Sequence, residues 1–313
     1  MSFISMNSLT SHDLSRLLGC PENELPSSCI ELFSRSNWHY EFIEGEALDV
    51  LVSELLNRIR RKEFSIVVPG DKTRWVRGWS ENLDQFVASE GKLESLAPKY
   101  VRSNMPVRLF RRLAQPVEPH FELNWRRVYQ EWLFRKYFAD CQRIYEFGCG
   151  SGIHVSVLAE MYPDKKIIGL DWAEPSCEIV NNMRRLRGWN TEGRLFDFYH
   201  PDYDVEIPRE SVVMTFAALE QISDASGAFI EFLMAKRPKL CVFIEPIYDW
   251  YDPANFIDHL AMRAHDIRKF LKGMHGILHQ LQQDGRIEIL KEHRVEFGSL
   301  LHEAYSQTIW RPV

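Results

Sequence analysis

The sequence lacks the cysteine spacing of zinc and iron–sulfur sites. It contains six cysteines, but no two of them form a Cys-x-x-Cys pair, so we expect neither a metal site nor a disulfide framework. It also lacks an apolar run long enough to span a bilayer, and its first residues lack the basic segment and apolar run of a signal peptide. We therefore predict a cytoplasmic protein with no membrane partner.

The sequence also lacks an excess of positive charge. Its 38 Lys and Arg residues are outnumbered by 44 Asp and Glu residues, which gives a formal net charge of −6. Because binding to nucleic acid calls for a basic surface, we expect no nucleic-acid partner. The 313 residues, of which 45% are hydrophobic, are enough for one large domain or two smaller ones.

One glycine-rich stretch organises the chain. Residues 143–152 read Arg-Ile-Tyr-Glu-Phe-Gly-Cys-Gly-Ser-Gly. The pattern predicts a short strand that ends in a tight turn, and the apolar spacing of residues 153–161 predicts a helix directly after it. Glycines let the backbone turn sharply and approach a ligand closely, and the free N–H groups at the start of a helix attract an anionic group. The stretch is therefore typical of a site for a nucleotide-like ligand.

The glycine spacing departs from the dinucleotide fingerprint G-x-G-x-x-G. Gly152 comes one residue early, Ile153 stands where the third glycine would be, and Glu146 precedes the turn. This E-x-G-x-G-x-G stretch resembles motif I of the class I S-adenosylmethionine (SAM) methyltransferases. The resemblance implies that Gly148, Gly150 and Gly152 form a loop around the methionine part of SAM. It places Glu146 near the amino group of that ligand.

Three later segments fit the same family. Asp171 ends a predicted strand over residues 166–171, 25 positions after Glu146 (171 − 146). An acid in this place can accept hydrogen bonds from both ribose hydroxyls, in a SAM site as in an NAD site. In the family, an acid after the third strand faces the adenine amino group and its neighbour packs on the ring, roles that the resemblance carries over to Asp197 and Phe198. The other residues that it assigns to the cofactor site are Trp172, Phe216 and Ala217.

From residue 143 onward, predicted strands and helices alternate, which favours a parallel sheet with crossover helices. The resemblance implies an α/β, Rossmann-like, seven-stranded and mostly parallel sheet in the order 3-2-1-4-5-7-6, flanked by helices, with residues 286–293 and 304–310 as its last strands. We expect the SAM methyltransferase domain to span residues 116–313. Residues 1–115 are predicted to form a mostly helical cap, or a region for substrate binding or dimerisation, so a homodimer is one option.

Residues 72–79 alternate Arg and Trp after a predicted turn. One interpretation is an edge strand whose aromatic side chains pack on the main domain while its arginines lie in water. The other is a substrate lid in which Arg74 and Arg77 contact a planar or anionic substrate. The edge strand is the favoured interpretation.

The catalytic residues are less evident, because methyl transfer needs a general base only when the acceptor is a poor nucleophile. The resemblance places the acceptor above the ends of the fourth and fifth strands, which makes Glu220 and His259 the catalytic candidates. The N/D-P-P-aromatic sequence of base methyltransferases is missing, since residues 215–218 read Thr-Phe-Ala-Ala. We therefore expect SAM-dependent methyl transfer to a hydroxyl or amine of a small molecule, of sugar or natural-product type.

Three alternatives stay open at this stage. The acceptor could be a protein or peptide, because nothing in the sequence selects the acceptor. A chain with the same motifs could also bind SAM or a nucleotide without catalysing a reaction. An NAD(P)-dependent oxidoreductase is disfavoured by Glu146 on the first strand and by Ile153 in place of a glycine.

Overall fold

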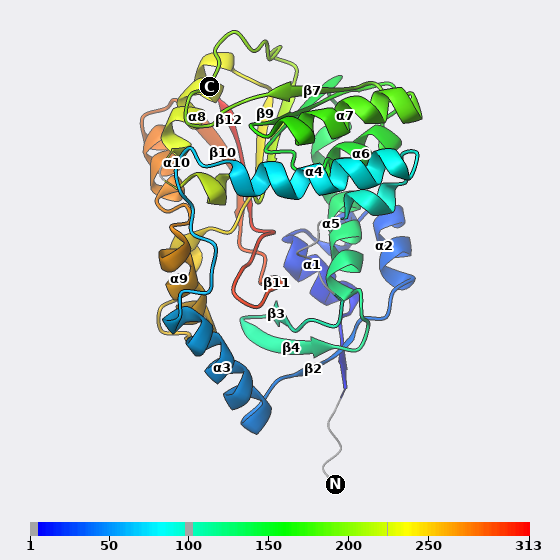
Figure 1. The fold of residues 1–313 in the computed structure, drawn as a ribbon. Helices are drawn as coiled ribbons and strands as arrows, with labels where there is room; N and C mark the ends of the chain where they lie inside the picture. Colours follow the sequence, from blue (N-terminus) through cyan, green and yellow to red (C-terminus); the bar gives the residue numbers. More distant parts are fainter. Residues whose placement is uncertain (1–5, 98–102, 224) are drawn as a thin grey trace.

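The computed structural model describes residues 6–97, 103–223 and 225–313, and its main element is a seven-stranded sheet (Figure 1). The strands of this sheet are β5 (Arg143–Phe147), β6 (Lys166–Asp171), β7 (Thr191–Leu195), β8 (Val212–Phe216), β9 (Leu240–Ile244), β10 (Ile287–His293) and β12 (Gln307–Pro312). They lie in the order β10-β12-β9-β8-β5-β6-β7, and β12 runs antiparallel to both of its neighbours. Numbered along the chain, this is the order 3-2-1-4-5-7-6, so the predicted fold class is confirmed.

Apolar side chains at alternate strand positions form a core on each face of this sheet. Ile144 and Met214 belong to one core, whereas their chain neighbours Tyr145 and Val213 belong to the other. Helices α5 (Phe121–Phe138), α6 (Ile153–Met161) and α7 (Glu174–Arg187) contribute to the first core, together with helices of the N-terminal stretch. Helices α8 (Ser226–Lys236) and α10 (Met274–Gln283) contribute to the second. Burial on both faces explains why these strands are apolar throughout.

The N-terminal stretch contains helices and a second, smaller sheet. Its helices are α1 (Ser11–Leu18), α2 (Ser27–Ser34), α3 (Gly45–Arg60) and α4 (Thr73–Ala88), with the short 3₁₀ turns η1 (Glu22–Glu24) and η2 (Leu93–Leu96). The strands of the second sheet are β1 (Asn7–Ser8), β2 (His39–Phe42), β4 (Arg112–Pro116), β3 (Val107–Leu109) and β11 (Phe297–Ser299). Because β11 pairs with β3, this sheet contains strands from both sides of the expected boundary at residue 116.

The remaining elements follow the fourth and fifth strands of the main sheet. They are the 3₁₀ turns η3 (Leu219–Ile222) and η4 (Tyr248–Trp250) and the helix α9 (Phe256–Arg268). Helix α9 packs against α3 of the N-terminal stretch, as Figure 1 shows at the left of the molecule. Within the described residues, no helix combines the length and the apolar character needed to cross a membrane.

The interpretation of residues 72–79 as an edge strand is wrong, because residues 73–88 form helix α4 (Figure 1). The Arg and Trp residues were read with the two-residue period of a strand. The residues that face inward are instead spaced by four, three and four positions: Trp75, Trp79, Asn82 and Phe86. That spacing is the period of one face of a helix.

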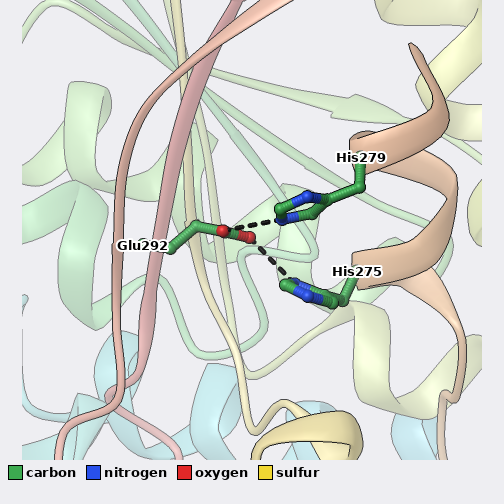
Figure 2. Close-up of side chains that lie close together, drawn as sticks. All are labelled: His275, His279 and Glu292. Atoms are coloured by element: carbon green, nitrogen blue, oxygen red, sulfur yellow. Dashed lines mark hydrogen bonds and ion pairs between the residues drawn. The ribbon is translucent and has the colours of Figure 1, made fainter. Parts of the chain in front are cut away.

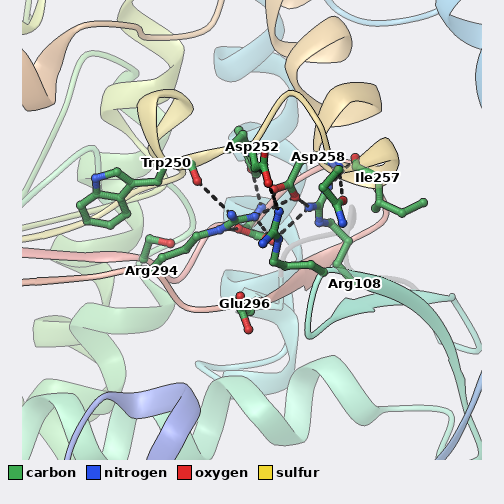
Figure 3. Close-up of polar contacts among 12 residues, drawn as sticks. Arg108, Trp250, Asp252, Ile257, Asp258, Arg294 and Glu296 are labelled. Carbon is green, nitrogen blue, oxygen red and sulfur yellow. Dashed lines mark hydrogen bonds and ion pairs between the residues drawn. The ribbon is translucent and has the colours of Figure 1, made fainter.

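A buried ionic network joins the second sheet to α9 and to the loop before β12 (Figure 3). The guanidinium of Arg108, on β3, donates to the Asp258 carboxylate and, at 3.0 Å, to that of Glu303. Arg294 donates to Asp258 at 2.7 Å and to Glu303 at 2.8 Å. Burial by itself would raise the pKa of Asp258, but the hydrogen bonds it accepts and the charges of both arginines lower that pKa below its ordinary value. Asp258 is therefore ionised at neutral pH.

We expect Arg108→Met to reduce the free energy of unfolding by about 3–5 kcal/mol, because it removes a fully buried cation that pairs with both Asp258 and Glu303. Urea denaturation would measure the change. The matched control is Arg35→Met, which breaks a surface pair with Glu31 whose side chains are 65% and 63% exposed and which should cost at most about 1 kcal/mol. Equal losses in the two variants would contradict a stabilising role for the network.

Candidate functional site

A pocket lies at the carboxyl ends of the parallel strands, which is the edge where α/β sheets bind ligands. The loops after β5, β6, β7 and β8 contribute to it, and helix α4 covers it. The lining residues are Trp75, Trp79, Gly148, Gly150, Asp171, Trp172, Phe198, Tyr199, Ala217, Ala218, Gln221 and Ile222.

The glycine loop after β5 forms one wall of the pocket. Gly148 and Gly150 have positive φ angles of +74° and +52°, a conformation that costs other residues free energy. At Gly148 a Cβ atom would also lie only 2.4 Å from the Cβ of Ala218. The N–H of Gly148 donates to the carbonyl of Leu170 on the next strand, at 2.7 Å. The turn therefore favours glycine at both positions, and the loop after β8 requires it at Gly148.

Asp171, at the end of β6, holds this loop in place. Its Oδ2 accepts a hydrogen bond from the N–H of Gly150, and its Oδ1 accepts one from the N–H of Ala173, both at 2.9 Å. Burial raises the pKa of Asp171 to about 6, and the charge of Glu146 acts in the same direction, against the hydrogen bonds. The carboxyl group therefore titrates just below neutral pH.

Helix α4 forms the roof of the pocket. The rings of Trp75 and Trp79 are stacked, with centroids 5.8 Å apart and an interplanar angle of 18°. The Arg74 guanidinium lies 4.2 Å from the centroid of the Trp75 ring and donates to Oε1 of Gln221 at 3.2 Å. Arg77 is exposed. Of the two arginines named for a substrate lid, Arg74 contacts a residue of the pocket lining and Arg77 does not. The lid itself remains a prediction.

A buried carboxylate shapes the turn after β8. Glu245 accepts hydrogen bonds from the N–H groups of Ala218 and Leu219 at 3.1 Å and of Glu220 at 3.3 Å. It thereby holds the turn at Ala217, a non-glycine residue with a φ of +50°. Burial, followed by the charge of Glu220, raises the pKa of Glu245 to about 8. Its contacts define Glu245 as a positioning residue for the pocket floor.

Glu146 lies beneath the glycine loop and does not line the pocket. The residue is 1% exposed, and its Oε1 lies 2.6 Å from Nδ1 of His154, on α6. The His154 ring is stacked on Phe216, with the centroids 4.3 Å apart. The contact of Glu146 with the amino group of SAM remains a prediction.

Of the predicted cofactor residues, six line the pocket: Gly148, Gly150, Asp171, Trp172, Phe198 and Ala217. The others lie around it: Glu146, Gly152, Asp197 and Phe216. Gly152 caps α6, and Asp197 accepts a hydrogen bond from the N–H of Tyr199 at 2.9 Å. Trp75 and Trp79 also line the pocket. From the sequence they were considered as part of a substrate lid, but they were not assigned to the cofactor site.

The two catalytic candidates occupy different surroundings. Glu220 is 5% exposed and directly precedes the pocket residue Gln221. Its Oε2 lies 2.7 Å from Nε2 of His302, in the loop between β11 and β12. His259 is exposed on α9 and is absent from the pocket lining. No motif connects residues 220 and 302 in the sequence, so the Glu220–His302 pair had no sequence signal.

The strand order and the pocket at the ends of β5 to β8 agree with one fold family. The chain has the fold of the class I SAM-dependent methyltransferases, as its strand order shows. No family model matches its sequence, and no curated protein matches it either.

Solved structures of three kinds illustrate the likeness. A SAM-dependent methyltransferase from Aquifex aeolicus is 11% identical, with 59% of this chain and 89% of that chain covered and a TM-score of 0.41. Human N-acetylserotonin methyltransferase in complex with SAM is 13% identical, with coverages of 83% and 66% and a TM-score of 0.44. The [4+2]-cyclase SpnF is 15% identical, with coverages of 74% and 78% and a TM-score of 0.44. Likenesses of this degree carry no information on ligand or substrate.

The contact between α4 and the glycine loop can be tested at Gly150, where a Cβ atom would lie 2.9 Å from Cζ2 of Trp79. We expect Gly150→Ala to lower the free energy of unfolding by about 1–3 kcal/mol through overpacking, in addition to the strain of its positive φ. Gly70→Ala isolates the strain, because Gly70 has a φ of +78° and nothing within 4 Å. Urea denaturation of both variants measures the difference. If the two substitutions cost the same, Trp79 does not press on the loop.

Proposed function

We propose that the protein binds SAM in this pocket and transfers its methyl group to a hydroxyl or amine of a small molecule. The observation that carries the proposal is the pocket itself. A glycine loop, a buried acid and aromatic side chains line one cavity at the carboxyl edge of a sheet with the order 3-2-1-4-5-7-6. These are the groups that a loop around methionine, a ribose diol and an adenine ring require.

The pocket residues fit the parts of this cofactor. Gly148 and Gly150 have no side chain that would keep a ligand away from the loop backbone. Asp171 has lone pairs that its two backbone hydrogen bonds do not use. The aromatic rings of Phe198 and Trp172 suit a planar base. When bound, SAM supplies a methyl group on a positively charged sulfur that serves as its own leaving group. The chain's residues then mainly align the acceptor and exclude water, effects worth roughly 7–11 kcal/mol of the barrier.

The acceptor is proposed to bind beside Gln221, between the roof and the Glu220–His302 pair. His302 is 16% exposed, and its Nδ1 is buried without a hydrogen-bond partner. Like Glu220, it lies beside the pocket lining and not in it, so a small rotation of the ring would be needed to present Nδ1 to the acceptor. A neutral His302 oriented by Glu220 would take the proton from an acceptor hydroxyl, as a general base does. His259 remains the alternative base from sequence, and its exposed position gives it no carboxylate partner among the described residues.

The other function classes are less well supported. A nicotinamide oxidoreductase would want a third glycine where Ile153 stands. A protein or peptide acceptor calls for an open groove beside the methyl group, whereas α4 lies over the pocket. A module that binds SAM without catalysis would have the same pocket, but it would not need the Glu220–His302 pair beside it.

The cofactor is tested first, by calorimetric titration with S-adenosylhomocysteine, the product of methyl transfer, with NAD⁺ as the comparator. We expect binding of the homocysteine product and none of NAD⁺. The ionised form of Asp171 is the better acceptor for two ribose hydroxyls, and its pKa is about 6, so the affinity should rise with pH. The dissociation constant should be roughly tenfold larger at pH 5 than at pH 7.

Asp171→Asn provides the control for this pH dependence, because an amide cannot titrate and can accept through only one oxygen. The variant should bind more weakly and lose the rise between pH 5 and pH 7. Binding of NAD⁺ alone would overturn the proposed cofactor. An unchanged pH profile in Asp171→Asn would remove Asp171 from the site.

The base is tested by comparing His302→Gln with His259→Gln in a methyl-transfer assay. The assay measures release of S-adenosylhomocysteine with a panel of hydroxyl-bearing small molecules. We expect His302→Gln to lower kcat by about a hundredfold or more, as loss of a general base does, with cofactor affinity unchanged. His259→Gln should retain activity. The reverse result would assign the base to His259.

A further inference from the structure

A second cluster of titratable side chains lies outside the pocket (Figure 2). His275 and His279 are four positions apart on α10, so both point from one face of the helix toward β10. Nδ1 of His275 lies 2.9 Å from Oε1 of Glu292, and Nε2 of His279 lies 2.8 Å from Oε2 of the same carboxylate. The two imidazole rings have centroids 4.1 Å apart. Three ligand-type atoms, one from each residue, all lie within 4.8 Å of one another.

The surroundings leave this cluster accessible to an ion. The three side chains are 30%, 39% and 22% exposed, in the order His275, His279 and Glu292. Among the described residues, the ion pairs of Glu292 are with these two histidines only, so no Lys or Arg competes for the carboxylate. The ring of Trp250, in η4, packs edge-on against His275 with the centroids 5.9 Å apart. One side of the cluster is therefore packed and the other faces water.

We propose that His275, His279 and Glu292 bind a divalent transition-metal ion, with Zn²⁺ as the first choice. Two imidazole nitrogens and one carboxylate oxygen are the donor set that suits zinc and the neighbouring first-row ions, whereas Mg²⁺ and Ca²⁺ take oxygen ligands. Three protein ligands leave a fourth position of a tetrahedral site for water. No residue of the methyl-transfer pocket belongs to this set, so the proposal is independent of the proposed function.

Binding would replace the two histidine–carboxylate hydrogen bonds with metal–ligand bonds. Each imidazole has a second nitrogen that can carry its proton, so a neutral histidine can present a free lone pair to the ion by changing tautomer. The charge of Glu292 offsets one of the two positive charges of the ion. The ion would then connect α10 to β10, the outermost strand of the main sheet. The site is thus a structural clip at the sheet edge.

The test is a calorimetric titration of the full chain, free of any histidine tag and of chelator, with zinc sulfate. We expect one equivalent of Zn²⁺ to bind, and we expect Co²⁺ to give the absorption bands of a four-coordinate site. His279→Ala and Glu292→Gln should each raise the dissociation constant at least tenfold. Glu292→Gln is the milder variant, since its amide oxygen still accepts a hydrogen bond from one histidine and keeps the apoprotein folded.

His12→Ala is the matched control, because His12 forms a histidine–carboxylate pair with Glu22 at 3.2 Å, and within the part of the chain that the structure describes this pair belongs to no three-residue ligand cluster. The control should bind zinc as the unaltered chain does. Circular dichroism of each apo variant separates loss of the site from loss of the fold. No stoichiometric binding by the unaltered chain, or equal binding by His279→Ala and His12→Ala, would overturn the proposal.

Discussion

The arrangement of the proposed acceptor side depends on one buried ionic interaction. Arg108 and Arg294 hold the Glu303 carboxylate from two directions, and Glu303 directly follows His302. That histidine reaches Glu220 across the carboxyl edge of the main sheet. The position of the proposed base is therefore set by charges on β3 and after β10, rather than by its own loop. The N-terminal stretch, through β3, is thus a structural support of the proposed acceptor side.

Such a network constrains the fold more than it stabilises it. Taking four charged groups out of water costs several kcal/mol for each ion, and their mutual attraction repays this cost only in a good geometry. Misplacing any one of the four, Arg108, Arg294, Asp258 or Glu303, would leave the buried positive and negative charges unbalanced. Packings in which β3, α9 and the loop before β12 are shifted are thereby disfavoured. Arg294 also donates to the carbonyl of Trp250 in η4, and Asp258 lies on α9. The same network therefore fixes the path of the chain after the fifth strand of the main sheet.

The parts of the structure that the sequence predicts are those built from neighbouring residues. The strand, glycine turn and helix of residues 143–161 and the position of Asp171 follow from local spacing, and the strand order follows from the family resemblance. Residues 72–79, at the start of α4, were misread because the alternation of Arg and Trp over eight residues is typical of a strand. The helical period becomes clear only when the run is followed as far as Phe86. His302 could not be predicted, because its partner Glu220 is distant in the chain and no spacing rule connects them. Glu146 was recognised, but its engagement by His154 depends on the packing of Phe216.

The two halves of the proposed site therefore differ in how they are encoded. The cofactor half comes mostly from one stretch, between Gly148 and Ile222, and its geometry is fixed by backbone conformation and by Asp171. The acceptor half joins α4, the turn after β8 and the loop before β12, which meet only in the folded chain. Substitutions in these three segments can change the acceptor without disturbing the cofactor loop, whereas changes to the glycines affect both reactants. Function depends on the site and not on the fold. The chemistry of Arg74, Glu220 and His302 should therefore guide the choice of acceptors to test.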